Sequence, residues 1–136
     1  VGIDFQWAGW GVGATDIIYM IATGLSDRQI NSLDLEGDVL RPYYAFFSSR
    51  RRQQQQQQQD YSYEELVFDF QVACVDYTRW IMACRLPGET PAKYAQRRIE
   101  MDPNLGAYRR SEAMMLWLLS RVEEYLPVME ARMMKG

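Results

Sequence analysis

The stretch SYEELVFDFQVACVDYTRWIMAC, residues 62–84, contains the clearest helix start in the chain. Ser62 and Glu65 stand three positions apart, the spacing of a capping box that begins an α-helix. Apolar side chains then recur mostly every three or four residues, which places them on one helix face. These side chains are Leu66, Phe70, Ala73, Tyr77, Trp80, Ile81 and Cys84. We expect this long amphipathic helix, which Pro87-Gly88 stops, to be a principal element of the core of a mainly α protein.

Residues 15–47 predict further helices on the N-terminal side of this stretch. The first, at about residues 17–23, is apolar nearly all round and is therefore expected to be buried. Thr15 or Asp16 can cap it by accepting backbone N–H bonds.

The next helix begins at a second capping box, formed by Ser26 and Gln29. Pro42 interrupts its apolar pattern. Because proline removes a helical hydrogen bond and costs about 3 kcal/mol or more, we expect a kink or break between residues 36 and 42.

Two helices are predicted on the C-terminal side, so that residues 62–136 are helical. One opens at Thr90-Pro91 and runs to about residue 101. The last runs from about Ala107 to Met133, with Pro127 expected to kink or end its first part. Its predicted apolar stripe consists of Leu116, Leu119, Val122, Leu126 and Met129.

Residues 48–61 form the one low-complexity segment, an arginine cluster followed by seven glutamines, Gln53 to Gln59. Such a polar tract buries too little apolar surface to offset its ordering entropy. We interpret it as a solvated insertion between two helices. A basic arm for an acidic partner and an aggregation-prone tract are the alternatives.

Composition favours one compact domain over residues 1–136. The chain is 48% hydrophobic, which is enough to bury a core. The net charge of −3 and a pI near 5.0 argue against nucleic acid and an anionic membrane as partners. Cys74 and Cys84 are ten positions apart in one helix, too far to bridge, and two free, buried thiols indicate a reducing compartment, by default the cytoplasm.

The N-terminal residues 1–6, Val-Gly-Ile-Asp-Phe-Gln, predict a short strand that ends in a tight glycine loop. Asp4 in this strand has two interpretations. It is either a turn-forming aspartate or a metal- or phosphate-handling carboxylate held on a rigid strand end. The loop also matches a dinucleotide-binding motif, but no second parallel strand follows it, and we keep an NAD-binding unit only as a distant alternative.

The order of Ile3-Asp4-Phe5-Gln6, a glycine loop and Asp16 before an apolar helix resembles the active-site region of ecdysteroid-kinase-like proteins, relatives of the aminoglycoside and choline kinases. A fainter similarity continues through Tyr43-Tyr44 and through Tyr61 to Leu66. The resemblance implies the C-terminal helical lobe of a protein-kinase-like fold, with one short N-terminal strand or hairpin remnant. In that family the nucleotide lobe and a His-Gly-Asp-type catalytic loop precede this region. The chain contains no histidine.

The resemblance implies ATP-dependent transfer of phosphate to a small-molecule hydroxyl acceptor in a longer parent protein. Asp4 would be the Mg²⁺ ligand and Asp16 would anchor the catalytic loop. Asp76 and Trp80 are weak candidates for the acceptor site. We expect this portion alone to be inactive and to bind neither Mg²⁺ nor ATP tightly. The alternative is a non-catalytic helical interaction module in which Asp4 is a turn residue.

Overall fold

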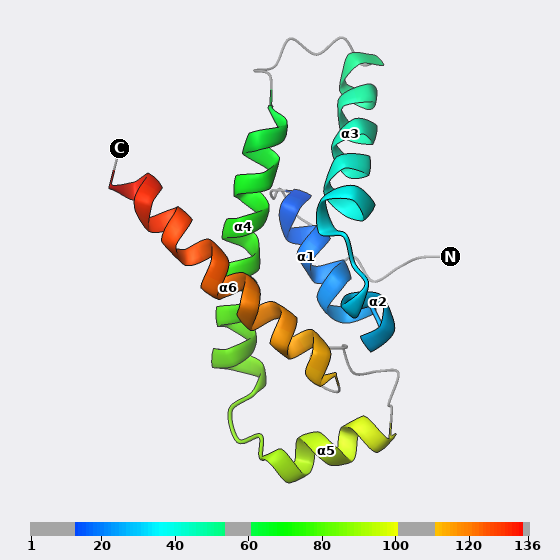
Figure 1. The fold of residues 1–136 in the computed structure, drawn as a ribbon, viewed down its shortest axis with the longest axis vertical. Coiled ribbons are helices and arrows are strands. Elements are labelled where there is room, and N and C mark those ends of the chain that lie inside the picture. Colours follow the sequence, from blue (N-terminus) through cyan, green and yellow to red (C-terminus); the bar gives the residue numbers. More distant parts are fainter. Residues whose placement is uncertain (1–12, 54–60, 101–110, 135–136) are drawn as a thin grey trace.

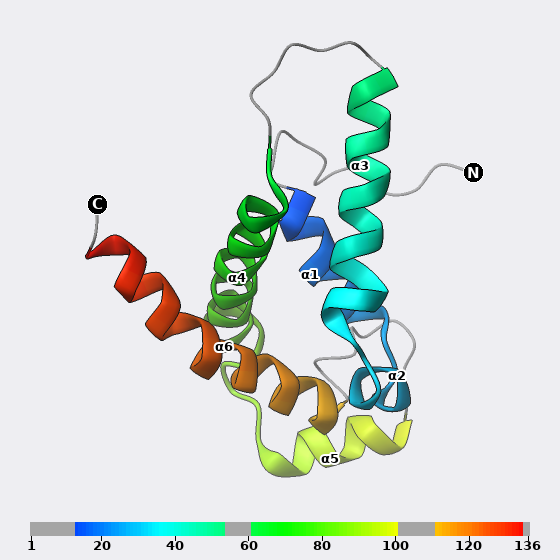
Figure 2. The same ribbon diagram turned by 45° about the horizontal axis from the view of Figure 1, so that its top comes forward.

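The structure is a computed structural model that describes residues 13–53, 61–100 and 111–134. These residues form helices and short connections and contain no β-strand, which confirms the mainly α fold class for this part of the chain. The strand predicted for residues 1–6 lies outside it. In Figures 1 and 2, α6 crosses in front of α4, α1 lies between α4 and α3, and α5 lies at one end. No helix among the described residues has the length and apolar character needed to cross a membrane.

Helix α1, Gly13–Gly24, begins earlier than the sequence predicts. Asp16 therefore lies within the first turn, and neither it nor Thr15 precedes the helix as a cap. The prediction that α1 is buried all round is wrong, because Tyr19 and Met20 are 54% and 57% exposed. One face only packs into the core; its residues are Ala14, Ile17, Ile18, Ile21 and Ala22.

Helix α2, Asp27–Asn31, begins at the capping box predicted from the sequence. The Gln29 backbone N–H donates to Ser26 Oγ over 3.4 Å, and the Ser26 N–H donates to Gln29 Oε1 over 2.9 Å. The two reciprocal bonds satisfy N–H groups that a helix start otherwise leaves without partners.

The helix that begins at Ser26 ends at Asn31, so the chain breaks at residues 32–34, earlier than the predicted 36–42, and the predicted range instead contains a change of helical winding. A π-helical segment, η1 (Leu35–Leu40), changes directly into α3 (Arg41–Gln53), and Pro42 is the second residue of α3. The Arg41 N–H reaches five residues back to the Glu36 carbonyl, as a π turn requires. Helix α3 also extends to Gln53, further than the expected end at residue 47, because arginine and glutamine are good helix formers. Residues 54–60, which include Gln54 to Gln59 of the glutamine tract, lie outside the described residues.

Helix α4, Tyr63–Trp80, is the central element, as its sequence predicts. Its capping box is present: the Glu65 N–H donates to Ser62 Oγ over 3.1 Å, and Glu65 Oε2 accepts the Ser62 N–H over 2.6 Å. A π segment, η2 (Ile81–Arg85), follows, and Gly88 turns the chain with φ 78°. Cys84 is exposed, so its predicted place in the buried stripe is wrong. The wider π winding after Trp80 rotates later positions away from the α-helical face.

Helix α5, Pro91–Glu100, has Pro91 at its first position as expected, and Thr90 Oγ1 accepts the Lys93 N–H over 3.2 Å. Helix α6, Glu112–Met133, is capped by Ser111, whose Oγ accepts the Met114 N–H over 2.9 Å. It therefore begins at Glu112, later than predicted. Pro127 lies inside α6, and the helix continues past it.

The predicted apolar stripe of α6 is wrong in register. The buried side chains are Met114, Leu118 and Tyr125. Leu116, Leu119 and Leu126 are instead 61%, 41% and 40% exposed. Leucines fall on two faces of this helix, and α4 covers only one of them, so periodicity alone does not identify the buried face.

The core lies where α1, α4 and α6 meet. Helix α4 packs against α1 and against α6, and α2 packs against α6. The largest fully buried side chains come from these three long helices and from η2; they are Phe70, Ile18, Ile21, Leu66, Ile81, Met114 and Leu118. Helix α5 contributes no buried residue.

Candidate functional site

The metal ligand predicted at Asp4 lies outside the described residues, as does most of the glycine loop that follows it. Among residues 13–53, 61–100 and 111–134, no three carboxylates or thiols group closely enough to hold a metal ion. The Mg²⁺ site therefore stays a prediction.

Asp16, the predicted anchor of the catalytic loop, lies in the first turn of α1 with an exposed side chain. It accepts no hydrogen bond from the other described residues. The same end of α1 lies against α3: a Cβ added to Gly13 would collide with the Tyr43 hydroxyl, so glycine provides the space for this close approach. Burial, and to a lesser degree the Asp16 charge, raises the pKa of Tyr43. The Tyr43 phenol is therefore neutral at physiological pH.

Asp76 and Trp80, the weak acceptor-site candidates, lie one turn apart on α4. Arg79 donates to Asp76 Oδ1 from Nε and Nη2 over 3.1 and 2.7 Å, although the carboxylate remains 65% exposed. The Arg85 guanidinium lies 4.6 Å from the centre of the half-buried Trp80 ring. Both side chains thus already have intramolecular partners, and neither lines the two clefts described next.

The larger cleft, of about 770 Å³, lies between η1, the start of α4, and α6. We call it the α4–α6 cleft. Four carboxylates and two guanidinium groups line it: Asp34, Glu36, Glu64, Glu124, Arg41 and Arg121. The excess of carboxylates makes this cleft more favourable for a cationic than for an anionic guest.

Each arginine of the α4–α6 cleft is already engaged by a carboxylate and an aromatic ring. Arg41 pairs with Glu36 and lies 4.9 Å from the centre of the Tyr63 ring. Arg121 Nη1 lies 2.6 Å from Glu124 Oε2, and its guanidinium lies 6.0 Å from the Tyr125 ring centre. Such pairs fix the arginines in place, although their exposure to solvent limits each to a small stabilisation.

Two tyrosine side chains, Tyr63 and Tyr125, also line this cleft, and the Tyr63 hydroxyl itself is buried. Burial, and then the nearby Glu36 charge, raises the pKa of Tyr63. Burial likewise raises the pKa of Tyr125 against the opposing effect of Arg121. Both phenols therefore stay protonated at neutral pH. The carboxylates that line the cleft can hold a small polar molecule, and the geometry of the cleft assigns no reaction.

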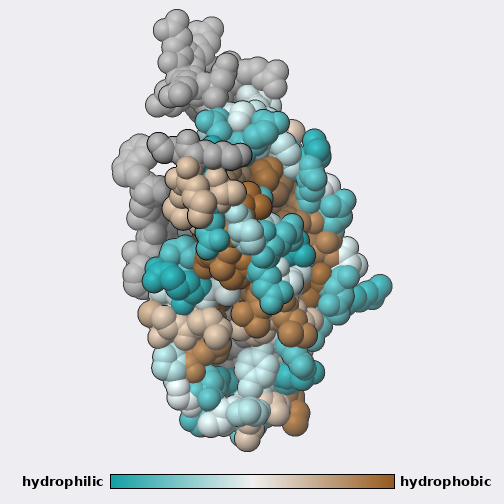
Figure 3. All heavy atoms as spheres, turned by 60° about the vertical axis from the view of Figure 1, so that its left-hand side comes forward, coloured by the Kyte–Doolittle hydropathy of each residue, from teal (hydrophilic) through white to brown (hydrophobic). Residues whose placement is uncertain are grey.

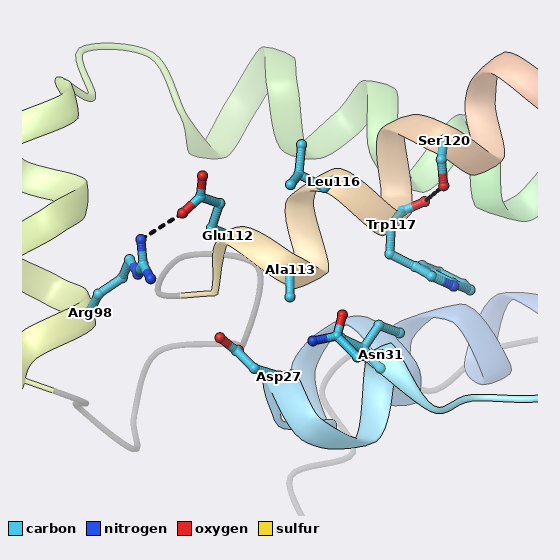
Figure 4. A pocket seen from close by; sticks show the side chains of 9 residues that line it. Asp27, Asn31, Arg98, Glu112, Ala113, Leu116, Trp117 and Ser120 are labelled. Carbon is cyan, nitrogen blue, oxygen red and sulfur yellow. Dashed lines mark hydrogen bonds and ion pairs between the residues drawn. The ribbon is translucent and has the colours of Figure 1, made fainter.

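The second cleft, of about 630 Å³, lies between α2, α5 and α6 (Figure 4). Arg98 Nη1 lies 2.7 Å from Glu112 Oε2 and closes one end of it. In Figure 4, Asp27 and Asn31 extend from α2 toward the start of α6, and the Trp117 ring lies at the opposite end from the ion pair. Trp117 also lines the α4–α6 cleft, so it is a lining residue of both clefts.

Sequence reasoning did not single out Trp117 or Arg121. The cause is the α6 register, because the predicted stripe placed both of these residues away from the core. Met114, Leu118 and Tyr125 lie on one helical face, because they are spaced by four and then seven residues. Arg121 lies on the same face. This spacing was the feature of the sequence that could have identified the buried face of α6.

The two cysteines differ in exposure, contrary to the prediction that both are buried. Cys74 is fully buried in α4, and burial raises the pKa of its thiol to about 12. Cys84 is exposed, and both thiols are free, as their separation predicts.

No protein family, no curated protein and no solved structure matches this chain. The class of this protein is therefore given by its fold alone: the part of the chain that the structure describes is mainly α-helical.

Proposed function

We propose that this chain is the C-terminal helical part of a kinase-like phosphotransferase that transfers the γ-phosphoryl group of ATP to a hydroxyl group of a small molecule. The proposal rests on the order of Ile3-Asp4-Phe5-Gln6, a glycine loop and the Asp16 helix. By this resemblance, Asp4 binds Mg²⁺. When bound, this ion neutralises charge on the β and γ phosphates.

The observation that carries the proposal is the state of the Asp16 carboxylate. It is exposed, it accepts no hydrogen bond from other described residues, and it lies in the first turn of α1, the turn nearest in sequence to the quoted motif. A carboxylate in this position is available to accept backbone N–H groups from a loop that packs there. In this role Asp16 is a positioning residue.

The packing of α1 supports the same role. Its apolar face is buried against α4, and Ile18 and Ile21 are completely inaccessible. The backbone of such a helix is held in place by its packing, so a side chain on it starts from a fixed position, as a positioning residue requires.

The experiment uses a longer parent protein that contains these residues together with an upstream His-Gly-Asp-type loop. Asp4→Asn is expected to abolish turnover with Mg-ATP and leave the fold intact. Asp16→Asn is expected to lower kcat with little change in KM or in the free energy of unfolding. Asp16→Glu is expected to retain part of the wild-type kcat. Asp27→Asn, an exposed first-turn aspartate of α2, is the matched control.

Two results would refute the proposal. One is an upstream coding sequence without such a loop, and the other is full activity of the Asp4→Asn parent. The chain studied alone is expected to bind Mg-ATP weakly, because most phosphate contacts would come from elsewhere in the parent. We also propose a cytoplasmic location, which the two free thiols support.

A further inference from the structure

Helix α6 carries a second regular stripe on the side opposite its buried face. Its members follow each other at spacings of four, three, four, three and four, so that they line up along the helix. They are Glu112, Leu116, Leu119, Glu123, Leu126 and Glu130, and all six are exposed. We call this row the acid–leucine stripe.

From Leu119 onward, the acid–leucine stripe has no covering element among the described helices, whereas Glu112 and Leu116 border the cleft between α2, α5 and α6. In Figures 1 and 2, α6 lies in front of α4, and no other described helix lies over its outer face. Figure 3 shows the face at the left of Figure 1, where hydrophobic and hydrophilic residues are interspersed over the surface. The apolar atoms of the stripe's leucines therefore remain in contact with water, which is unfavourable at about 25 cal/mol per Å².

The charges of the stripe are largely uncompensated. Glu112 pairs with Arg98, but Glu123 and Glu130 make no ion pair with the other described residues. Leucines in line with free carboxylates form a surface that is both apolar and negative. A helix with leucines on one face and lysines or arginines beside them complements it in both respects.

We propose that the acid–leucine stripe is a docking surface for a basic amphipathic helix of another protein. The stripe from Glu112 to Glu130 is about 27 Å long at the usual helical rise, enough for about five turns of a partner helix. This proposal does not depend on Asp4, on ATP or on phosphoryl transfer.

A second copy of this chain fits the stripe less well. Antiparallel pairing of two stripes would bring Leu116 against Leu126, which is favourable. It would also bring Glu112 against Glu130 at both ends, and like charges repel across an interface. Charge complementarity thus favours the basic partner.

The test uses a synthetic helical peptide of about 20 residues with leucines on one face and lysines flanking them. A second peptide has glutamates in place of the lysines, and a third has the same composition in scrambled order. Binding to the full chain is measured by fluorescence anisotropy at low and high salt. Analytical ultracentrifugation of the chain alone reports self-association.

We expect saturable binding of the lysine peptide only, and weaker binding at high salt. Glu123→Gln with Glu130→Gln is expected to weaken binding roughly 2- to 30-fold, the loss of two exposed ion pairs. Leu119→Ala is expected to weaken it roughly 5- to 30-fold. The matched control Glu100→Gln, at an exposed glutamate on α5 that lines neither cleft, is expected to leave binding unchanged.

Three results would overturn the proposal. The first is no saturable binding of the lysine peptide. The second is a loss of binding affinity in the Glu100→Gln control equal to the loss in the stripe variants. The third is self-association of the chain that Leu119→Ala abolishes, which would identify a second copy as the occupant. Circular dichroism of each variant checks that the helices are retained.

Discussion

Two adjacent leucines of α6 provide a direct test of which face of this helix is buried. Leu118 is 0% exposed and packs in the core, whereas Leu119, about 100° further round the helix, is 41% exposed. We predict that Leu118→Ala lowers the free energy of unfolding by about 2–5 kcal/mol, the transfer and cavity cost of a fully buried leucine. Leu119→Ala is expected to cost less than about 1 kcal/mol, since alanine's better helix propensity offsets part of the lost contact.

The comparison is made by urea unfolding followed by far-UV circular dichroism. With a slope of about 1–2 kcal/mol/M, the midpoint for Leu118→Ala is expected to fall by roughly 1–5 M, and that for Leu119→Ala by less than about 1 M. The two variants remove the same atoms from neighbouring positions of one helix, so each controls for the other. Equal losses, or a larger loss for Leu119→Ala, would show that the buried face of α6 has been misassigned.

Three other predictions test the first turns and the thiols. The Glu65 carboxylate accepts the backbone N–H of the residue that caps α4, and this bond lowers its pKa from the usual 4.5. The carboxylate therefore stabilises the fold fully above pH 4.5, and this stabilisation is lost as the pH falls through the lowered pKa. In urea unfolding, the free energies of unfolding of the wild type and Glu65→Gln should become equal in acid. Cys84 is expected to react with a thiol reagent in the native protein at neutral pH, whereas Cys74, with a pKa of about 12, should react only on unfolding, and Cys84→Ser should remove the fast phase. Gly13→Ala is expected to be better tolerated in a Tyr43→Phe background, since that change removes the hydroxyl that an alanine Cβ would meet; equal effects in both backgrounds, measured by thermal unfolding, would contradict this contact.

The helix starts were the features most predictable from the sequence. Ser62 with Glu65 and Ser26 with Gln29 form their predicted capping boxes, because a cap involves only neighbouring residues. The stop at Pro87-Gly88 is equally local, and the structure has the positive φ that Gly88 supplies.

Features that depend on distant contacts were predicted less well. Whether Leu118 or Leu119 faces inward depends on where α4 lies, and the α6 sequence offers an apolar row on either side. The π segment after Trp80 exposes Cys84, and no local pattern announced that change of winding. The two clefts share Trp117, which comes from the buried side of α6, so they could not be located before the register was known.

The position of the glutamine run has a consequence for natural length variation. The run joins the end of α3 at Gln53 to the start of α4 at Tyr63. The entropy cost of closing a connection rises only logarithmically with its length, by about 0.6 kcal/mol for each doubling. Alleles whose glutamine repeats differ by several codons should therefore encode the same folded body with nearly the same melting temperature. Such a repeat can lengthen or shorten over generations without selection against the fold itself.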